Sequence, residues 1–234
     1  MAATTLSDIQ TAIALDFDQA STAPDPTTDD YARRTLLINR AEKKWKNALG
    51  GRWDVLRSTA TLSVSSGSVA LPDDFTPNGL VAPKGGFLLA NGAYYPIVKF
   101  QDLGNYLTSD LACYITGDDT NGYYLNFQPT PSSSFSLSIT YFSKYIAQTS
   151  GGSGQEKLSS GTDETKCPDP DYIVLEVVAQ LLKADGEAQL GEDYAKQSND
   201  LLQQMLAQNN MGNIGVPNEI SLSHDLNDYP AIGE

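Results

Sequence analysis

Residues 167–184, CPDPDYIVLEVVAQLLKA, form the stretch that decides the fold of this 234-residue chain. Pro168 and Pro170, each followed by an aspartate, make a helix start signal, because proline suits a first turn and acids favour the positive helix end. The residues after them, 172–184, are apolar nearly all round the helix. A surface helix has only one apolar face. We therefore expect this helix to be covered on both sides.

A second C-terminal helix follows directly. Gly186 interrupts the first pattern, and an amphipathic pattern then continues to about Met211. Its apolar positions are Leu190, Tyr194, Leu201, Leu202 and Met205.

The N-terminal residues predict two further helices. Thr5 or Ser7 can cap the first, which has apolar residues at helical spacing and runs to about Ala20. The proline-containing segment 23–30 breaks it. Thr28 or Asp29 caps the second, and Gly50-Gly51 ends it. The core-facing stripe of this second helix contains Ile38, Ala41, Trp45, Ala48 and Leu49.

The residues between these helical ends predict short strands. Residues 59–72 alternate on both sides of a Ser-Ser-Gly turn, which predicts a hairpin. Residues 87–98 predict a second hairpin, since Asn91-Gly92 is the favoured type I′ pair. Residues 113–129 and 135–145 predict further antiparallel strands.

The resulting fold class is α+β. We expect a helical bundle formed by the N- and C-terminal helices, with an inserted antiparallel β lobe and an extended C-terminal tail. The expected parts are a helical domain (1–57 and 165–211), a β-rich lobe (58–148), a flexible Gly/Ser loop (149–164) and a C-terminal arm (212–234).

The charge is acidic and unevenly distributed. The net charge of −14 argues against a protein that grips nucleic acid, because binding phosphates needs clustered Lys and Arg. Residues 31–57 nevertheless carry eight of the fifteen bases. Such a layout favours subunits that meet basic face to acidic face, and a merely solvated helix face is the alternative. The basic residues assigned to a subunit interface are Arg33, Arg40, Lys43 and Lys44.

Catalytic and metal-binding patterns are missing. The one histidine, His224, lies in the polar tail, and no nucleophile motif or phosphate loop occurs. Asp118-Asp119 lies in a Gly-flanked turn, where a weak calcium site is conceivable but local turn geometry is the simpler interpretation. Cys113 and Cys167 lack zinc-ligand spacing, and a disulfide between them stays open. We expect no catalytic residues, no cofactor and no metal.

No targeting or membrane segment is evident. The N-terminus has no basic start and no apolar run, and no stretch approaches the ~20 apolar residues of a membrane helix. We expect synthesis in the cytoplasm and no membrane contact. The tail, in contrast, has isolated apolar residues spaced for contact with a partner: Ile214, Val216, Ile220, Leu222, Leu226 and Tyr229.

The chain resembles the head-to-tail adaptor (connector) proteins of tailed double-stranded DNA bacteriophages. The likeness is carried by residues 31–56, 61–75, 90–97, the strands ending at Tyr145, and residues 167–206. The resemblance implies a structural virion protein in the neck, in a ring of about twelve subunits that joins the portal to the tail and continues the DNA channel.

The resemblance also implies partners. They are the portal protein, which the C-terminal tail would contact, a downstream tail or nozzle protein, and double-stranded DNA that passes without specific binding. An acidic chain suits a channel through which DNA must slide. Two other classes stay open: another neck or tail-tube protein, and a carbohydrate-binding module built on the Tyr-rich strands.

Overall fold

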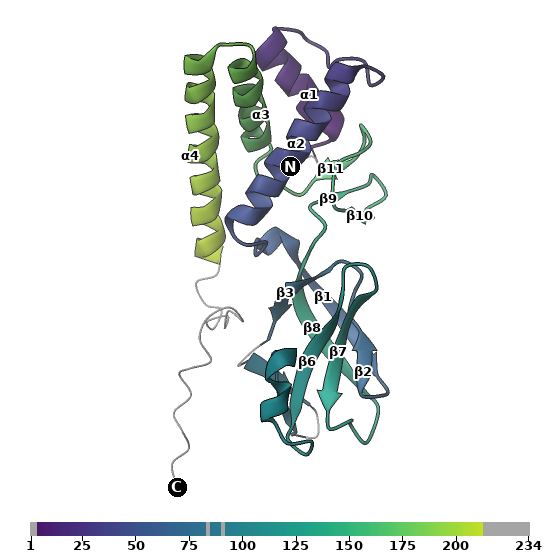
Figure 1. Cartoon of the computed structure of the whole chain (residues 1–234). Coiled ribbons are helices and arrows are strands. Elements are labelled where there is room, and N and C mark those ends of the chain that lie inside the picture. Colours follow the sequence, from purple (N-terminus) through teal and green to yellow (C-terminus); the bar gives the residue numbers. More distant parts are fainter. Residues whose placement is uncertain (1–3, 83–84, 90–91, 213–234) are drawn as a thin grey trace. The chain divides into compact units, whose positions relative to one another are not determined.

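The computed structural model describes residues 4–82, 85–89 and 92–212 (Figure 1). They divide into two compact units. The helical unit combines the residues up to Arg57 with those from Ser143 to the end of the last helix, and the β unit runs from Ser58 to Phe142. Helices and antiparallel strands both occur, so the predicted α+β class is confirmed.

The helical unit contains helices from both ends of the chain and three very short strands. Its elements are α1 (Leu6–Ile13), η1 (Ala14–Asp18), α2 (Asp29–Ala48), η2 (Asp54–Leu56), β9 (Ala147–Gln148), β10 (Gly154–Gln155), β11 (Glu164–Thr165), α3 (Asp171–Ala184) and α4 (Ala188–Gly212).

A capping box begins the first helix. The hydroxyl of Thr5 accepts a hydrogen bond from the N–H of Asp8 at 3.2 Å, and the Asp8 carboxylate accepts the N–H of Thr5 at 2.9 Å. The α-helical part is shorter than the predicted helix to Ala20, because η1 continues it as a π-helical turn. A 3.6-residue sequence pattern does not distinguish this wider turn.

Both ends of α2 follow the sequence signals. The Thr28 hydroxyl caps its start by accepting the N–H of Tyr31 at 3.3 Å. Gly50 and Gly51, with φ of 59° and 80°, lead the chain away from its end.

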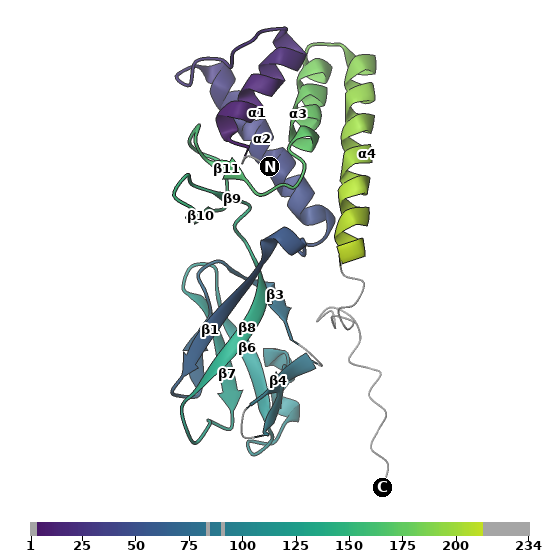
Figure 2. The ribbon, with the colours of Figure 1, turned by 180° about the vertical axis from the view of Figure 1, so that it is seen from behind.

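Helix α3 forms the centre of the helical unit. It packs against α4, α2 and α1, and Figures 1 and 2 both show it between α4 on one side and α1 with α2 on the other. Its buried residues are Tyr172, Ile173, Val174, Glu176, Val177, Val178, Ala179, Leu181 and Leu182. The predicted cover on both sides is confirmed, but the chain's own helices provide it. The apolar surface of α3 is therefore no evidence for packing between subunits.

The Gly/Ser-rich segment 149–164, predicted as a flexible loop, contains strand β10, the start of strand β11 and one buried leucine. Strands β10 and β11 both pair antiparallel with β9. Buried Leu158 is tied to Asn39 of α2 by two hydrogen bonds, its N–H to Oδ1 at 2.8 Å and its carbonyl from Nδ2 at 2.9 Å. Glycine and serine make a backbone permissive, but partners outside the segment decide whether it is held in place.

The β unit contains short strands and the 3-10 helix η4. Its elements are β1 (Arg57–Val64), β2 (Ser68–Ala70), β3 (Phe75–Val81), β4 (Gly86–Leu88), β5 (Tyr94–Pro96), η4 (Phe100–Asn105), β6 (Ala112–Asp118), β7 (Gly122–Gln128) and β8 (Phe135–Ser143). One sheet has the order β1-β8-β3, another has the order β2-β7-β6, and β4 pairs with β5.

The hairpin predicted over residues 59–72 is wrong. Its first run is β1, which pairs with β8, and its second run is β2, which pairs with β7 in the other sheet. The Ser-Ser-Gly turn therefore carries the chain from one sheet to the other. Alternation shows that each run has one buried face, but it does not show which strand is the partner.

The second predicted hairpin is present as the pair β4 and β5. Leu89 donates its N–H to the carbonyl of Ala93 at 2.8 Å, and β4 pairs antiparallel with β5. Gly92, with a φ of 84°, donates its N–H to the carbonyl of Leu89 at 2.9 Å. The predicted Asn91-Gly92 turn includes Asn91, which lies outside the described residues.

One hydrophobic core joins the sheets of the β unit. It includes Val64 of β1, Phe75 of β3, Leu125 and Phe127 of β7, and Ile139 of β8. All five side chains are nearly inaccessible to solvent. Two sheets that share one core form a sandwich-like arrangement. The predicted strands at 113–129 are confirmed as the antiparallel pair β6 and β7.

Candidate functional site

The outward face of α2 is the first candidate site. The side of α2 that faces the helical core carries Arg34, Ile38, Ala41, Glu42 and Trp45. Helical spacing places another stripe on the opposite side, and its side chains are exposed. These exposed residues are Arg33, Leu36, Arg40 and Lys43, and the name "basic face" is used below for this set.

The basic face combines positive charge with an apolar centre. Leu36 is 52% exposed, and Arg33 and Arg40 lie three residues before it and four residues after it. Between residues 31 and 48 the one acid is Glu42, which is buried. A protein partner with an apolar centre and an acidic rim would bury the exposed leucine and pair the surrounding cations.

Lys44, predicted with Arg33, Arg40 and Lys43 as part of this face, has a partner within the chain. Its Nζ lies 2.8 Å from Oε2 of Glu176 on α3. The same carboxylate oxygen accepts the hydroxyl of Ser198 on α4 at 3.2 Å. Lys44 thus helps to hold α2, α3 and α4 together.

Arg34, next to Arg33, has a structural position that sequence analysis missed. Its side chain is 3% exposed, and its Nη2 lies 2.8 Å from Asp18 and 2.7 Å from Asp30. The guanidinium also lies 5.8 Å from the centre of the Phe17 ring. In the sequence, only the four-residue spacing of Asp30 and Arg34 indicates one of these two ion pairs.

A lysine-lined hollow continues the positive surface beyond the end of the basic face. Lys43, Gln155, Glu156, Lys157 and Ser159 surround a volume of about 450 Å³. Lys144 approaches Glu156 at 3.1 Å.

Lys46 belongs to the same region. Burial lowers the pKa of the Lys46 ammonium, and the neighbouring Lys144 and Lys43 act in the same direction, while Glu156 opposes them. Its Nζ donates to the carbonyl of Lys144 at 3.1 Å. This region is therefore a concentration of positive charge in an otherwise acidic chain.

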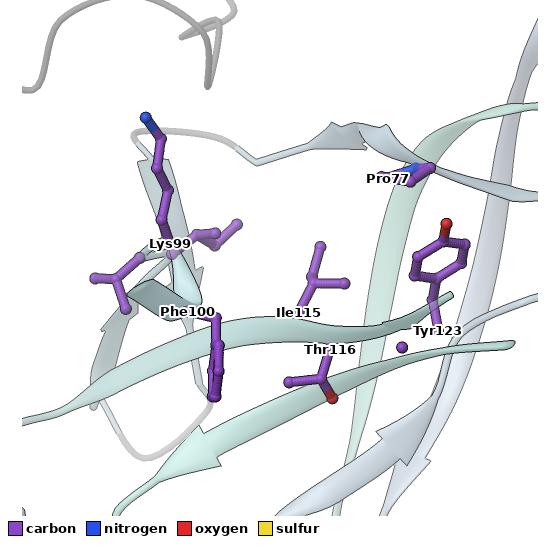
Figure 3. A pocket seen from close by; sticks show the side chains of 9 residues that line it. Pro77, Lys99, Phe100, Ile115, Thr116 and Tyr123 are labelled. Carbon is purple, nitrogen blue, oxygen red and sulfur yellow. The ribbon is translucent and has the colours of Figure 1, made fainter. Parts of the chain in front are cut away.

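The β unit has a hollow of its own, shown in Figure 3. Its volume is about 360 Å³, and its lining residues are Pro77, Ile97, Val98, Lys99, Phe100, Ile115, Thr116, Gly117 and Tyr123. Phe100 is 63% exposed and its ring lies 5.7 Å from that of Tyr114. Lys99 is the one charged side chain in this lining. The hollow offers a shallow apolar contact surface.

The aspartates of the β6–β7 turn act locally. Oδ1 of Asp118 accepts the N–H groups of Thr120 at 2.8 Å and of Asn121 at 2.7 Å. These hydrogen bonds, with that of the Asn121 side chain, lower the pKa of Asp118. The turn interpretation is confirmed. Within the described ranges, His, Cys, Asp and Glu form no group of three or more that could hold a metal ion.

Both cysteines are free and buried. Burial raises the pKa of the Cys113 thiol to about 12, and it also raises that of Cys167. Burial and hydrogen bonds from both thiols to backbone carbonyls thus give these cysteines structural positions.

The predicted portal-contact residues, Ile214, Val216, Ile220, Leu222, Leu226 and Tyr229, lie outside the described residues, as does His224. Among the helices of the described ranges, none combines the length and apolar character that a membrane crossing requires.

Comparison with known proteins gives a family match. The family model described as "SU10 adaptor protein" matches residues 4–219, which is nearly the whole chain. A search of curated proteins finds no match.

Proposed function

The chain belongs to the SU10 adaptor protein family, and we propose that it forms a ring that joins the portal to the tail and continues the DNA channel. The resemblance to phage adaptor proteins is confirmed at the level of the family. Membership makes this protein a structural adaptor of phages. The family match over residues 4–219 is the observation that carries the proposal.

The proposed ring contains about twelve copies in the neck of the virion. Its subunits meet through the basic face, where Arg33, Arg40 and Lys43 are exposed. Support comes from the burial pattern: α3 is already covered within the chain, so the outer helices supply the surface that the helical unit offers to another copy. Lys44 is left out of this interface because Glu176 binds it.

The proposed channel role rests on the charge of the chain. A net charge of −14 repels the phosphates of DNA, so packaged DNA can slide through the ring without sticking. No catalytic group, metal or cofactor takes part in this proposed role.

The proposed contact with the portal is made by the C-terminal arm, residues 212–234. Its apolar residues are spread along a polar segment that has four acids and neither lysine nor arginine. Ordering such a segment costs about 1–2 kcal/mol per residue for the backbone. A long contact with several apolar anchors offsets this cost. The opposite side of the ring contacts a downstream tail or nozzle protein.

The test is assembly on the portal. The full chain is mixed with purified portal protein of the same phage, and native mass spectrometry and image averages are recorded at several salt concentrations. We expect a complex of high mass with a ring of density on the portal. Absence of association at every salt concentration would overturn the proposal.

Two alternatives make different experimental predictions. A different neck or tail-tube protein would form rings that do not bind the portal, so the same mixture separates it from an adaptor. A carbohydrate-binding role is suggested by the exposed aromatic rings of the β unit, Phe100 and Tyr124, since aromatic faces stack on sugars. Binding to a glycan array would support that role.

A further inference from the structure

The outward face of α4 matches the basic face of α2 in charge. Asp193 and Asp200 lie on the side of α4 away from its buried residues Ser198, Leu202 and Met205. Leu190, which is 44% exposed, lies near one end of the same stripe. The name "acidic face" is used below for Leu190, Asp193, Gln197 and Asp200, all of which are exposed. Glu192 and Lys196 lie beside this stripe.

The two faces also match in spacing. Arg33 and Arg40 are seven residues apart, and so are Asp193 and Asp200. Seven residues span two turns of an α-helix, or about 10.5 Å. Two ion pairs can therefore form at once when the helices lie alongside each other.

An antiparallel arrangement aligns the remaining positions. When Arg33 meets Asp200 and Arg40 meets Asp193, Leu36 lies opposite Gln197. Further along the contact, Lys43 lies opposite Leu190, where its aliphatic stem can cover the leucine. A parallel arrangement instead places Leu36 opposite Lys196. The antiparallel register thus gives each member of the basic face a compatible neighbour.

The two faces cannot pair within one chain. Each points away from α3, which lies between α4 and α2 in both views of Figures 1 and 2. Among the described residues, no ion pair occupies Arg33, Arg40, Asp193 or Asp200. The matching surfaces are therefore available to a second copy.

We propose that the basic face of one copy binds the acidic face of α4 in the next copy, in an antiparallel helix pair. The proposal rests on the proposed ring function and names the surfaces that join its subunits. A contact between two different faces leaves one face of each kind free, so it repeats from copy to copy. Such head-to-tail contacts close into rings when the rotation between copies allows it.

The first experiment is disulfide trapping in the full chain. Leu36→Cys and Gln197→Cys are introduced together, and the protein is oxidised with and without purified portal protein. We expect a ladder of covalent oligomers. The native Cys113 and Cys167 are buried and do not compete. A mixture of the two single variants should give a dimer joined from position 36 to position 197, identified by peptide mass spectrometry.

Charge exchange tests the same contact without cysteines. We expect R33E/R40E and D193K/D200K each to weaken self-association by about tenfold or more, because two attractive pairs become repulsive. The variant with all four changes should recover it. The matched controls K99E/K183E and D73K/D119K reverse exposed charges outside both faces and should leave self-association unchanged.

The outcomes separate this inference from the proposed function. Rings on the portal without a disulfide between positions 36 and 197, or without recovery in the fourfold variant, overturn the inference and leave the adaptor role standing. Absence of any assembly with the portal contradicts the adaptor role itself. A disulfide ladder with charge-exchange recovery supports the inference.

Discussion

The ammonium nitrogen of Lys44 lies 2.8 Å from Oε2 of Glu176. The adjacent Lys43, in contrast, belongs to the exposed basic face. Lys44 is itself 56% exposed, whereas Glu176 is 11% exposed and also accepts a hydrogen bond from Ser198. Glu176 is therefore the buried member of the pair, and its negative charge is stabilised by the Lys44 ammonium. Two neighbouring lysines in the sequence thus have different roles.

The first prediction compares these two lysines. Lys44→Met should lower the free energy of unfolding by about 1 kcal/mol, because it leaves the Glu176 carboxylate without its cation. Lys43→Met should change it by less than about 0.5 kcal/mol, as expected for an exposed side chain. Urea unfolding followed by circular dichroism measures both. Equal effects of the two substitutions would contradict the distinction.

The second prediction concerns pH and buried Glu42. Burial raises the pKa of the Glu42 carboxyl from 4.5 to about 7, and the nearby Thr165 side chain offsets this only in part. The unfolded chain releases this proton near pH 4.5, whereas the folded chain keeps it until about pH 7. The stability that Glu42 contributes is therefore fully present below pH 4.5 and lost as the pH rises to about 7.

Glu42→Gln should remove this pH dependence. At pH 8 the variant should be more stable than the native protein by up to about 3 kcal/mol, and near pH 4 the two should be similar. Denaturant titrations at several pH values measure the difference. The control is Glu192→Gln, at an exposed position of α4. If the free energy of unfolding changes with pH in the same way for the native protein and Glu42→Gln, Glu42 is not the source of the pH dependence.

The third prediction concerns thiol reactivity. Because burial raises the pKa of both Cys113 and Cys167, neither forms the reactive thiolate near neutral pH. A chromogenic disulfide reagent should label neither thiol in the folded protein and both in denaturant. Fast labelling of the native protein would contradict the burial of that cysteine.

The fourth prediction tests the basic face in assembly. Reversing Arg33, Arg40 and Lys43 together should block association with the portal complex and leave the circular dichroism spectrum unchanged. Single reversals should be mild, since one exposed pair contributes about 0–1 kcal/mol. Normal assembly of the triple variant at both low and high salt would mean that the basic face is exposed to solvent in the assembly and takes no part in its contacts.

The fifth prediction concerns the C-terminal arm. Deletion of residues 212–234 should leave a soluble protein with unchanged thermal unfolding, because α3 and the helices around it supply the core of the helical unit. Particles made with the truncated protein should lose the adaptor and leak DNA. Retention of packaged DNA by such particles would show that the arm is dispensable.

The sequence by itself determined the local structure of the helical ends. Thr5 and Thr28 cap helices, and Gly186, with a φ of 91°, separates α3 from α4 as predicted. Each of these signals acts within about one turn of the backbone. The residues that produce the structure are therefore neighbours in the chain, and pattern reasoning identifies them.

Only the tertiary structure decided the partners of residues that lie far apart in the chain. Lys44 and Glu176 are separated by 132 positions, and β1 and β2 follow each other in the chain yet belong to different sheets. Alternation and charge show that a residue is buried or basic, but several partners would satisfy each pattern. Packing of the whole unit selects one partner, and that selection left Arg33, Arg40 and Lys43 exposed while Lys44 became part of the fold.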